Sequence, residues 1–374
     1  MGRGPAVIRS YILSAVRSAV VPRNGAFSHL TLHDLAKPVV MECIRRSGIG
    51  VNDIDEIIVG NALGAGGNPA RLISLAAGLG EHVGGLTIDR QCCSGLDAIN
   101  LANAMIKSGS ARIVIVGGVE SYSRRPLRLQ TFHDGRPPIV YDRPPFTPWP
   151  ERDPDMAHAA NELAKSLNIS RQAQDAWAME SHRKAQDSHA RMASEIVPIE
   201  GVTRDVFTRN LSEKTCARMS PNVGSITPAN TSVAADAAAF CIVASHDVAK
   251  FMRGKSVEII SGQTIGGQPD CPGIAPIAAI QQVLTDGNLQ PHEIDVAEIM
   301  EAYAAQAIAC VSQTGLNKDL TNLGGGSLAR GHPIGASGAI NAVRLYHELI
   351  DAGGNGIAAI AAAGGLGTAL LLRA

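Results

Sequence analysis

The feature that most constrains this chain is an order of secondary-structure signals that occurs twice. Residues 54–60 have the apolar pattern of a strand ending in a glycine turn, residues 94–100 open an apolar helix, and residues 113–118 are typical of a short buried strand. The same three signals return at 294–299, 337–341 and 356–365. The offset, on the order of 240 residues, is too long for a solenoid and predicts one duplicated α/β unit. A shared β-α-β pattern without duplication is the alternative.

A segment of different composition separates the two copies. Residues 123–155 are rich in Pro and Arg, which prevents a continuous helix or a central strand. Helices are predicted at 156–167 and at 171–193, the second capped by Ser170. The insertion is either an irregular surface segment or a lid over a pocket. We therefore expect an N-terminal half at residues 1–122, an inserted loop domain at 123–232, a return strand and helix at 233–255, and a C-terminal half at 256–374.

Composition excludes several classes of function. The 33 Lys and Arg residues nearly balance the 34 Asp and Glu residues, and aromatic residues are 3% of the chain, so no nucleic-acid partner is expected. No apolar run reaches the roughly 18 residues of a membrane span, and no signal peptide is recognised, which predicts a cytoplasmic protein without a membrane partner. The seven cysteines form no Cys-x-x-Cys pair and no Cys/His cluster, so we expect no metal site.

One motif places a cysteine at the start of a predicted helix. Cys92 follows the strand-like residues 85–89 and precedes Ser94 and Gly95. Peptide dipoles at a helix N-terminus stabilise a thiolate, and lowering the pKa from about 8.5 to about 6.5 would ionise most of this thiol at neutral pH. Cys92 is therefore a candidate nucleophile for attack on a carbonyl. The alternative is a small buried residue where the helix packs on a strand.

A second motif, Gly-His-Pro-Ile-Gly-Ala-Ser-Gly, begins at Gly331 and leads into the corresponding helix of the other half. A neutral imidazole at His332 could take a proton from a thiol or donate a hydrogen bond to a developing oxyanion. Because His332 and Cys92 occupy matching places in the two repeats, they would meet if the halves pack about a pseudo-twofold axis. A histidine that only packs in the core is the alternative.

Longer motifs carry a resemblance to a known family. They are TIDRQCCSGLDAI (87–99), VGGVESYS (116–123), ITPANTSVAADAAA (226–239), EAYAAQA (301–307) and GGSLARGHPIGASG (325–338). Over almost its full length the chain resembles the thiolases. The resemblance implies a five-layered α/β/α/β/α fold of two similar halves, with a loop domain inserted in the first. It also implies coenzyme A thioesters as substrates in lipid metabolism, no permanently bound cofactor, and a homodimer that can pair into a tetramer.

The resemblance assigns roles to individual residues. Cys92 would accept the acyl group, and His332 would activate it and help to form an oxyanion hole. Backbone N–H groups of Cys92 and Ala363 would hold the thioester oxygen. The matched coenzyme A contacts are Ser232 and Met156 in the pantetheine tunnel, and Arg218 near the phosphates.

The chain also departs from the family pattern at two positions. Thiolases have a second cysteine in a Cys-x-Gly-Gly-Gly motif that moves the α-carbon proton, whereas here Ala361 stands there. The asparagine of their Asn-Glu-Ala-Phe motif is Met300 here, and a thioether cannot replace an amide donor. A subgroup with His-Asp-Cys-Phe is not matched, because Ala302 occupies the cysteine position. Cys93 as a replacement base is disfavoured, because adjacent residues at a helix start point about 100° apart.

Three functions remain open at this point. The first is a thiolase-superfamily acyltransferase that forms an acyl-Cys92 intermediate from acyl-CoA and handles its second substrate in an atypical way. The second is an ordinary acetyl-CoA acetyltransferase or 3-ketoacyl-CoA thiolase with an unidentified acid/base. The third is a non-catalytic thiolase-like subunit that binds acyl-CoA.

Overall fold

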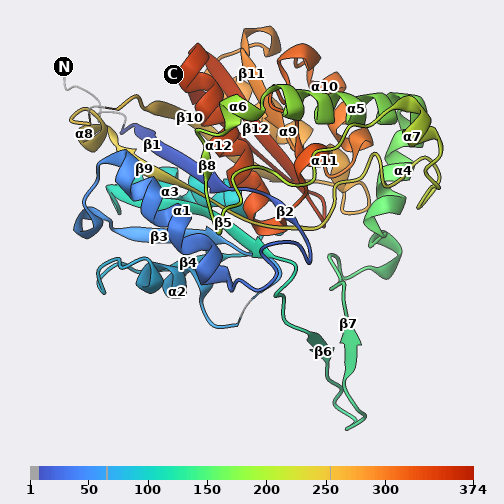
Figure 1. Ribbon diagram of the computed structural model, residues 1–374, viewed down its shortest axis with the longest axis horizontal. Coiled ribbons are helices and arrows are strands. Elements are labelled where there is room, and N and C mark those ends of the chain that lie inside the picture. Colours follow the sequence, from blue (N-terminus) through green and yellow to red (C-terminus); the bar gives the residue numbers. More distant parts are fainter. Residues whose placement is uncertain (1–7, 65, 253) are drawn as a thin grey trace.

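Two groups of strands, one from each half, form the centre of the structure, a computed structural model that describes residues 8–64, 66–252 and 254–374 (Figure 1). The N-terminal half contributes β1 (Ser10–Ser18), β3 (Glu56–Gly60), β4 (Leu86–Ile88), β5 (Ile113–Ser121) and β9 (Ala235–Ser245), in the order β1-β9-β5-β3-β4. The C-terminal half contributes β10 (Val257–Gly266), β11 (Val296–Ile299), β12 (Asn355–Ala362) and β13 (Leu366–Arg373), in the order β11-β12-β13-β10. A short antiparallel pairing of β1 with β10 joins the two groups.

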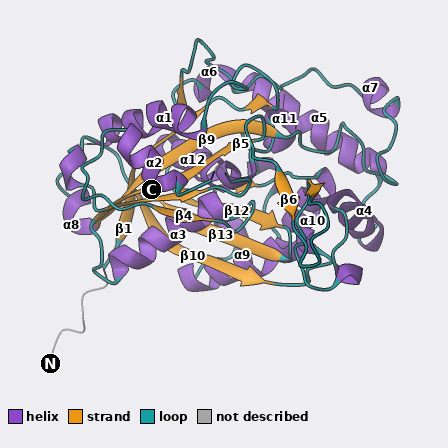
Figure 2. Cartoon of the chain, turned by 90° about the horizontal axis from the view of Figure 1, so that it is seen from below, coloured by secondary structure: helices purple, strands orange, loops and turns teal. Residues whose placement is uncertain are grey.

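Helices cover both faces of each sheet and so produce five layers. The outer layers are α1 (Leu32–Ser47) with α2 (Pro69–Ala76), and α9 (Ala275–Gly287) with α10 (Ala304–Thr314). The middle layer, between the two sheets, contains α3 (Ser94–Lys107) and α12 (Ile334–Ala352). Figure 2 shows α1 and α9 on opposite sides, with strands and α12 between them. The five-layered fold is therefore confirmed.

Strands β5 and β12 are apolar along most of their length, because each of their faces packs against a helical layer. In β5, Ile113 and Ile115 pack toward the outer layer, whereas Val114 and Val116 pack toward the middle layer. The same alternation occurs in β12 of the other half. Side chains that alternate between two buried faces give the continuous apolar runs that the sequence shows at both places.

The helix limits differ from prediction at two places. Helix α12 begins at Ile334, three residues before the Ser-Gly pair that predicted its start, directly after the extended Pro333. The helix predicted at 171–193 is split into α5 (Arg171–Asp187) and α6 (His189–Met192). The break lies at Ser188, whose hydroxyl donates to the backbone of Leu323. Serine side chains that bond to a backbone carbonyl compete with helix continuation.

The inserted segment has two parts. Strands β6 (Arg128–Gln130) and β7 (Ile139–Tyr141) form a hairpin that extends away from the rest of the chain, as Figure 1 shows. The second part contains α4 (Met156–Ser166), α5, α6 and α7 (Glu213–Ala217). The hairpin is thus a surface projection, whereas α4 packs beside α10. The domain limits inferred from the sequence remain a prediction.

Shorter elements complete the fold. They are β2 (Val21–Pro22), β8 (Ile196–Val197), α8 (His246–Ala249) and α11 (Ser327–Arg330). No helix in the described part of the chain combines the length and the apolar character that a membrane crossing requires.

Glycines bring the two middle helices unusually close together. A Cβ atom added to Gly95 in α3 would lie 2.7 Å from the backbone nitrogen of Ala339 in α12. One added to Gly338 in α12 would lie 2.6 Å from the backbone nitrogen of Leu96 in α3. A methyl group fits at neither position without separating the helices, so this contact fixes how the two halves meet.

We expect Gly95→Ala to destabilise the protein by about 1–3 kcal/mol, because the added methyl group overpacks a contact between backbones. Denaturant unfolding of the natural and altered proteins measures this difference. Gly266→Ala serves as the control, since nothing lies within 4 Å of the added atom there. Equal stability of the natural protein and Gly95→Ala would contradict the close packing of α3 on α12.

Candidate active site

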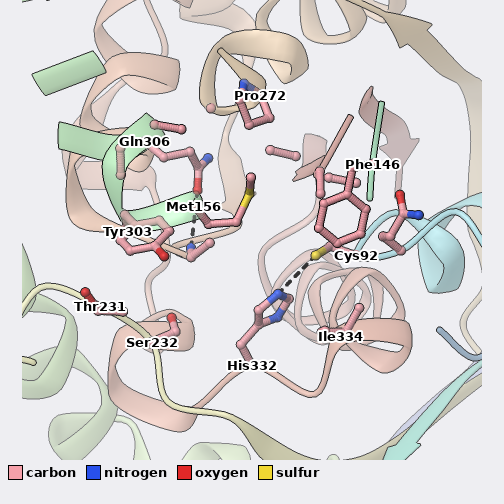
Figure 3. Close-up of a pocket in the computed structure, with 18 of the residues that line it drawn as sticks. Cys92, Phe146, Met156, Thr231, Ser232, Pro272, Tyr303, Gln306, His332 and Ile334 are labelled. Carbon is pink, nitrogen blue, oxygen red and sulfur yellow. Dashed lines mark hydrogen bonds between the residues drawn. The ribbon is translucent and has the colours of Figure 1, made fainter. Parts of the chain in front are cut away.

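A cavity of about 310 Å³ lies where the N-terminal ends of α3 and α12 meet. Cys92 and His332 both line it, and each lies two residues before the first residue of its helix. The Cys92 Sγ and His332 Nε2 atoms are 3.1 Å apart, and Figure 3 shows the two side chains pointing toward each other. The structure thus brings together the two residues that the sequence singled out.

A tight turn before α3 sets the direction of the Cys92 side chain. Gln91 has a φ of 46°, a left-handed conformation that is costly for a residue with a side chain. Ser94 stabilises the turn, since its hydroxyl accepts from the Arg90 backbone at 2.8 Å and donates to the Gln91 carbonyl at 2.6 Å. Cys93 is turned the other way, with its thiol 3.6 Å from the Ile360 carbonyl in the core. Cys93 is therefore not a replacement base in the pocket.

Ser337 determines which nitrogen of His332 carries the proton. The Ser337 hydroxyl lies 3.1 Å from the Pro333 carbonyl and 2.7 Å from His332 Nδ1. When it donates to the carbonyl, it accepts from Nδ1, and the neutral imidazole then carries its proton on Nδ1. Its Nε2 lone pair faces the Cys92 thiol, which is the arrangement a general base needs.

Burial favours the uncharged forms of both Cys92 and His332. It raises the pKa of the Cys92 thiol to about 12 and lowers the pKa of His332 to about 4. Loss of hydration thus opposes the thiolate that the peptide dipoles at the helix N-terminus would stabilise.

Other residues expected at the site fall into two groups. Ala363, Ser232, Met156 and Ala361 line the same cavity as Cys92. Arg218 lies exposed at the end of α7, outside the residues that line the cavity, and its contact with phosphate remains a prediction.

Met300 does not restore the missing amide group. It is buried beside the cavity rather than in its lining, and its sulfur accepts a hydrogen bond from Ser327 at 3.4 Å. The next residue, Glu301, accepts hydrogen bonds from Trp177 and Ser181 of α5. Glu301 thus anchors the loop domain and does not reach the reacting groups.

Glu120 supports the site from behind. Its buried carboxylate accepts from the Gly335 backbone at 3.0 Å and from the Ala62 backbone at 2.9 Å, which ties the start of α12 to the N-terminal half. Burial raises the pKa of Glu120 to about 7. Among the described residues, no group of three His, Cys, Asp or Glu side chains is placed to hold a metal ion.

Sequence reasoning missed several residues of this site. Ser337 stands within the quoted Gly-His-Pro motif, but its role follows only from its hydrogen bonds. Tyr122 and Tyr303 line the cavity from two different halves, and Phe146 reaches it from the inserted segment. The position of Tyr303 in the Met-Glu-Ala-Tyr stretch was the one sequence signal for these aromatic groups.

A neutral resting pair predicts how Cys92 reactivity depends on pH. Because its thiol pKa is raised, alkylation by iodoacetamide should accelerate about tenfold per pH unit between about pH 6 and pH 9. Peptide mass spectrometry of Cys92 measures the rate, with Cys92→Ser as the control for the partly exposed Cys271. A rate that levels off below neutral pH would instead show a preformed thiolate–imidazolium pair.

Comparison with known proteins agrees with this architecture. The family model for the thiolase N-terminal domain matches residues 10–247, and the model for the thiolase C-terminal domain matches residues 255–374. The chain is 35% identical over 379 aligned positions to the Staphylococcus aureus protein named "Putative acetyl-CoA C-acetyltransferase VraB", which covers 97% of this chain and 98% of that protein.

Solved structures show the same relationship. The Bacillus anthracis acetyl-CoA acetyltransferase superposes with a TM-score of 0.92 at 31% identity and covers 99% of this chain and 100% of its own. The Acat5 thiolase of Ascaris suum, solved in complex with coenzyme A, has a TM-score of 0.90 at 32% identity and covers 98% of this chain and 99% of its own. The chain belongs to the thiolase family.

Proposed function

We propose that this protein is an acyltransferase that takes an acyl group from an acyl-CoA thioester onto Cys92. The observation that carries the proposal is the 3.1 Å contact between Cys92 Sγ and His332 Nε2 inside a cavity open to a ligand. The named activity of the relatives, acetyl-CoA acetyl transfer, supports the same class of reaction.

Acyl transfer to Cys92 follows from the neutral pair. As Sγ attacks the thioester carbon, its proton passes to Nε2 of His332, while Ser337 holds the proton on Nδ1. The resulting imidazolium then has a proton on Nε2 that it can give to the departing coenzyme A sulfur. His332 therefore acts first as base and then as acid.

The thioester oxygen needs donors while it carries negative charge. The backbone N–H of Cys92 faces its own sulfur and lowers the pKa of the thiol, which opposes the effect of burial. Ala363 lines the same cavity, and protonated Nε2 of His332 adds a third donor. Together these groups form the oxyanion hole of the proposal, and each donor typically contributes about 10²–10³-fold in rate.

Coenzyme A enters this proposal as part of the substrate, with no permanently bound cofactor. Ser232 and Met156 line the cavity where the pantetheine arm would lie, and Arg218 is the proposed phosphate contact. The structural relative from Ascaris suum was solved with coenzyme A, which supports this substrate.

For the assembly we propose a cytoplasmic homodimer of lipid metabolism that can pair into tetramers. The projecting hairpin supports the larger assembly, since Leu127 beside β6 is 82% exposed and Val140 on β7 is 60% exposed.

Transfer to the second substrate has to differ from that of a standard thiolase. Ala361 lines the cavity at the position of the second cysteine, and Cys92 is the one thiol among the described residues of the lining. A missing general base typically costs about 10²–10⁴-fold. The acceptor therefore needs little proton abstraction: an already acidic carbon, a carbanion formed by decarboxylation, or an amine, alcohol or thiol.

An ordinary acetyl-CoA acetyltransferase with another acid/base is the second candidate, favoured by the names of the relatives. A non-catalytic subunit that binds acyl-CoA is the third. Acetoacetyl-CoA cleavage at the rate of a standard thiolase would select the ordinary enzyme over the atypical one.

Intact-mass measurement after incubation with acetyl-CoA tests the proposed intermediate. We expect one acetyl group on the natural protein and none on Cys92→Ser. His332→Ala should slow formation of this adduct about 10²-fold or more, because the base is gone. The absence of any adduct on the natural protein with acetyl-CoA and acetoacetyl-CoA would favour the non-catalytic subunit.

A further inference from the structure

Three hydroxyl groups that line the cavity form no hydrogen bond with the described residues. Tyr122, just after β5, and Tyr303, at the start of α10, both line it, and neither phenol hydroxyl forms a hydrogen bond with the described residues. Figure 3 shows Tyr303 beside Gln306 and Met156 on one side of the pocket. Besides burial, which has the largest effect, interactions with Cys92 and with Tyr303 raise the pKa of Tyr122. Both phenols therefore line the same cavity as the nucleophile.

Thr231 adds a third hydroxyl to this group. Its backbone forms an isolated antiparallel bridge with Tyr303, which places the two side chains on the same side. The Thr231 hydroxyl is buried in the cavity lining and has no hydrogen-bond partner. In contrast, the hydroxyl of Tyr346, buried in the core, is bonded to the Leu13 carbonyl at 3.1 Å. Buried hydroxyls are normally satisfied in this way, so the unsatisfied Thr231 hydroxyl is available to a ligand in the cavity.

The lining is mostly apolar, its other polar side chains are neutral, and it carries no formal charge. Within the described chain, the cavity lining contains no Asp, Glu, Lys or Arg, and burial keeps His332 neutral by lowering its pKa to about 4. Arg125 lies 5.7 Å from the Tyr122 ring centre, but it is paired with Asp142 at 2.6 Å and lies outside the lining. A carboxylate would lose its hydration here without gaining a cation, whereas a neutral oxygen needs only a donor.

We propose that this pocket selects an uncharged acyl group with a hydroxyl group beyond the thioester, and that Tyr122 and Tyr303 bind this hydroxyl. The inference rests on the proposed acyl transfer to Cys92 and specifies which acyl group is transferred. It also disfavours acyl groups that end in a carboxylate. Both phenols remain protonated donors, since burial raises their pKa values.

The transfer step itself leaves the selected oxygen unchanged. The bond between Cys92 Sγ and the acyl carbon forms, and the bond from that carbon to the coenzyme A sulfur breaks. The thiol proton moves through His332 to the released coenzyme A. The phenols act only by holding the acyl group, so they are specificity residues and not the acid or base.

The test compares three thioesters that differ at the far end of the acyl group. Rapid-quench intact mass gives the rate of Cys92 acylation by 3-hydroxybutyryl-CoA (each enantiomer separately), butyryl-CoA and succinyl-CoA. For one enantiomer we expect the hydroxylated group to react about 3- to 10-fold faster than butyryl, and succinyl to react slowest. Tyr122→Phe and Tyr303→Phe should each lower the hydroxybutyryl-to-butyryl ratio, and the double variant should bring it close to unity.

Tyr141→Phe on β7 is the matched control, because Tyr141 lies on the projecting hairpin and not in the cavity lining. Its ratio should equal that of the natural protein. Equal rates for all three thioesters, or a ratio that both cavity variants leave unchanged, would overturn this inference while the acyl-Cys92 intermediate stands. Failure of every thioester to acylate the natural protein would overturn the proposed function as well.

Discussion

The site depends on the close approach of α3 and α12 in the middle layer. Gly95 and Gly338 let the helix backbones touch, and each helix carries its reactive residue two positions before its first turn. The 3.1 Å contact between Cys92 and His332 therefore follows from the packing of two halves, each of which supplies one partner. One half alone supplies only Cys92 or only His332, so the pair forms only when the two halves pack together. The duplication is thus part of how the site is formed.

Burial is the second constraint on this pair. In the cavity the charged forms of both residues lose hydration, and no charged side chain among the described lining residues compensates for this loss. Burial therefore favours the neutral forms of Cys92 and His332. The remaining polar side chains of the lining are neutral hydroxyl and amide groups.

Much of the fold and of the site could be predicted from the sequence, because these features depend on local sequence patterns. The strand after residue 54, the strand that begins at residue 113 and the meeting of Cys92 with His332 all follow from apolar periodicity and from matching places in two repeats. The start of α12 and the break at Ser188 could not, since the hydrogen bonds there join residues far apart in the chain, Gly335 to Glu120 and Ser188 to Leu323. The effect of burial on the Cys92 pKa could not be predicted, because a helix N-terminus is visible in the sequence and the enclosure of a cavity is not. Tyr122 and Tyr303 lie far apart along the chain, so only the fold brings them together.

We propose that this protein keeps the acylation half of thiolase chemistry and has lost the group that takes a proton from the second substrate. Coenzyme A released from acetyl-CoA, measured together with the acetoacetyl-CoA formed, tests this claim most directly. We expect a single burst that releases about one coenzyme A per chain, with no acetoacetyl-CoA above background. Continuous release of coenzyme A accompanied by acetoacetyl-CoA would contradict it, because this reaction requires the acid/base group that Ala361 lacks.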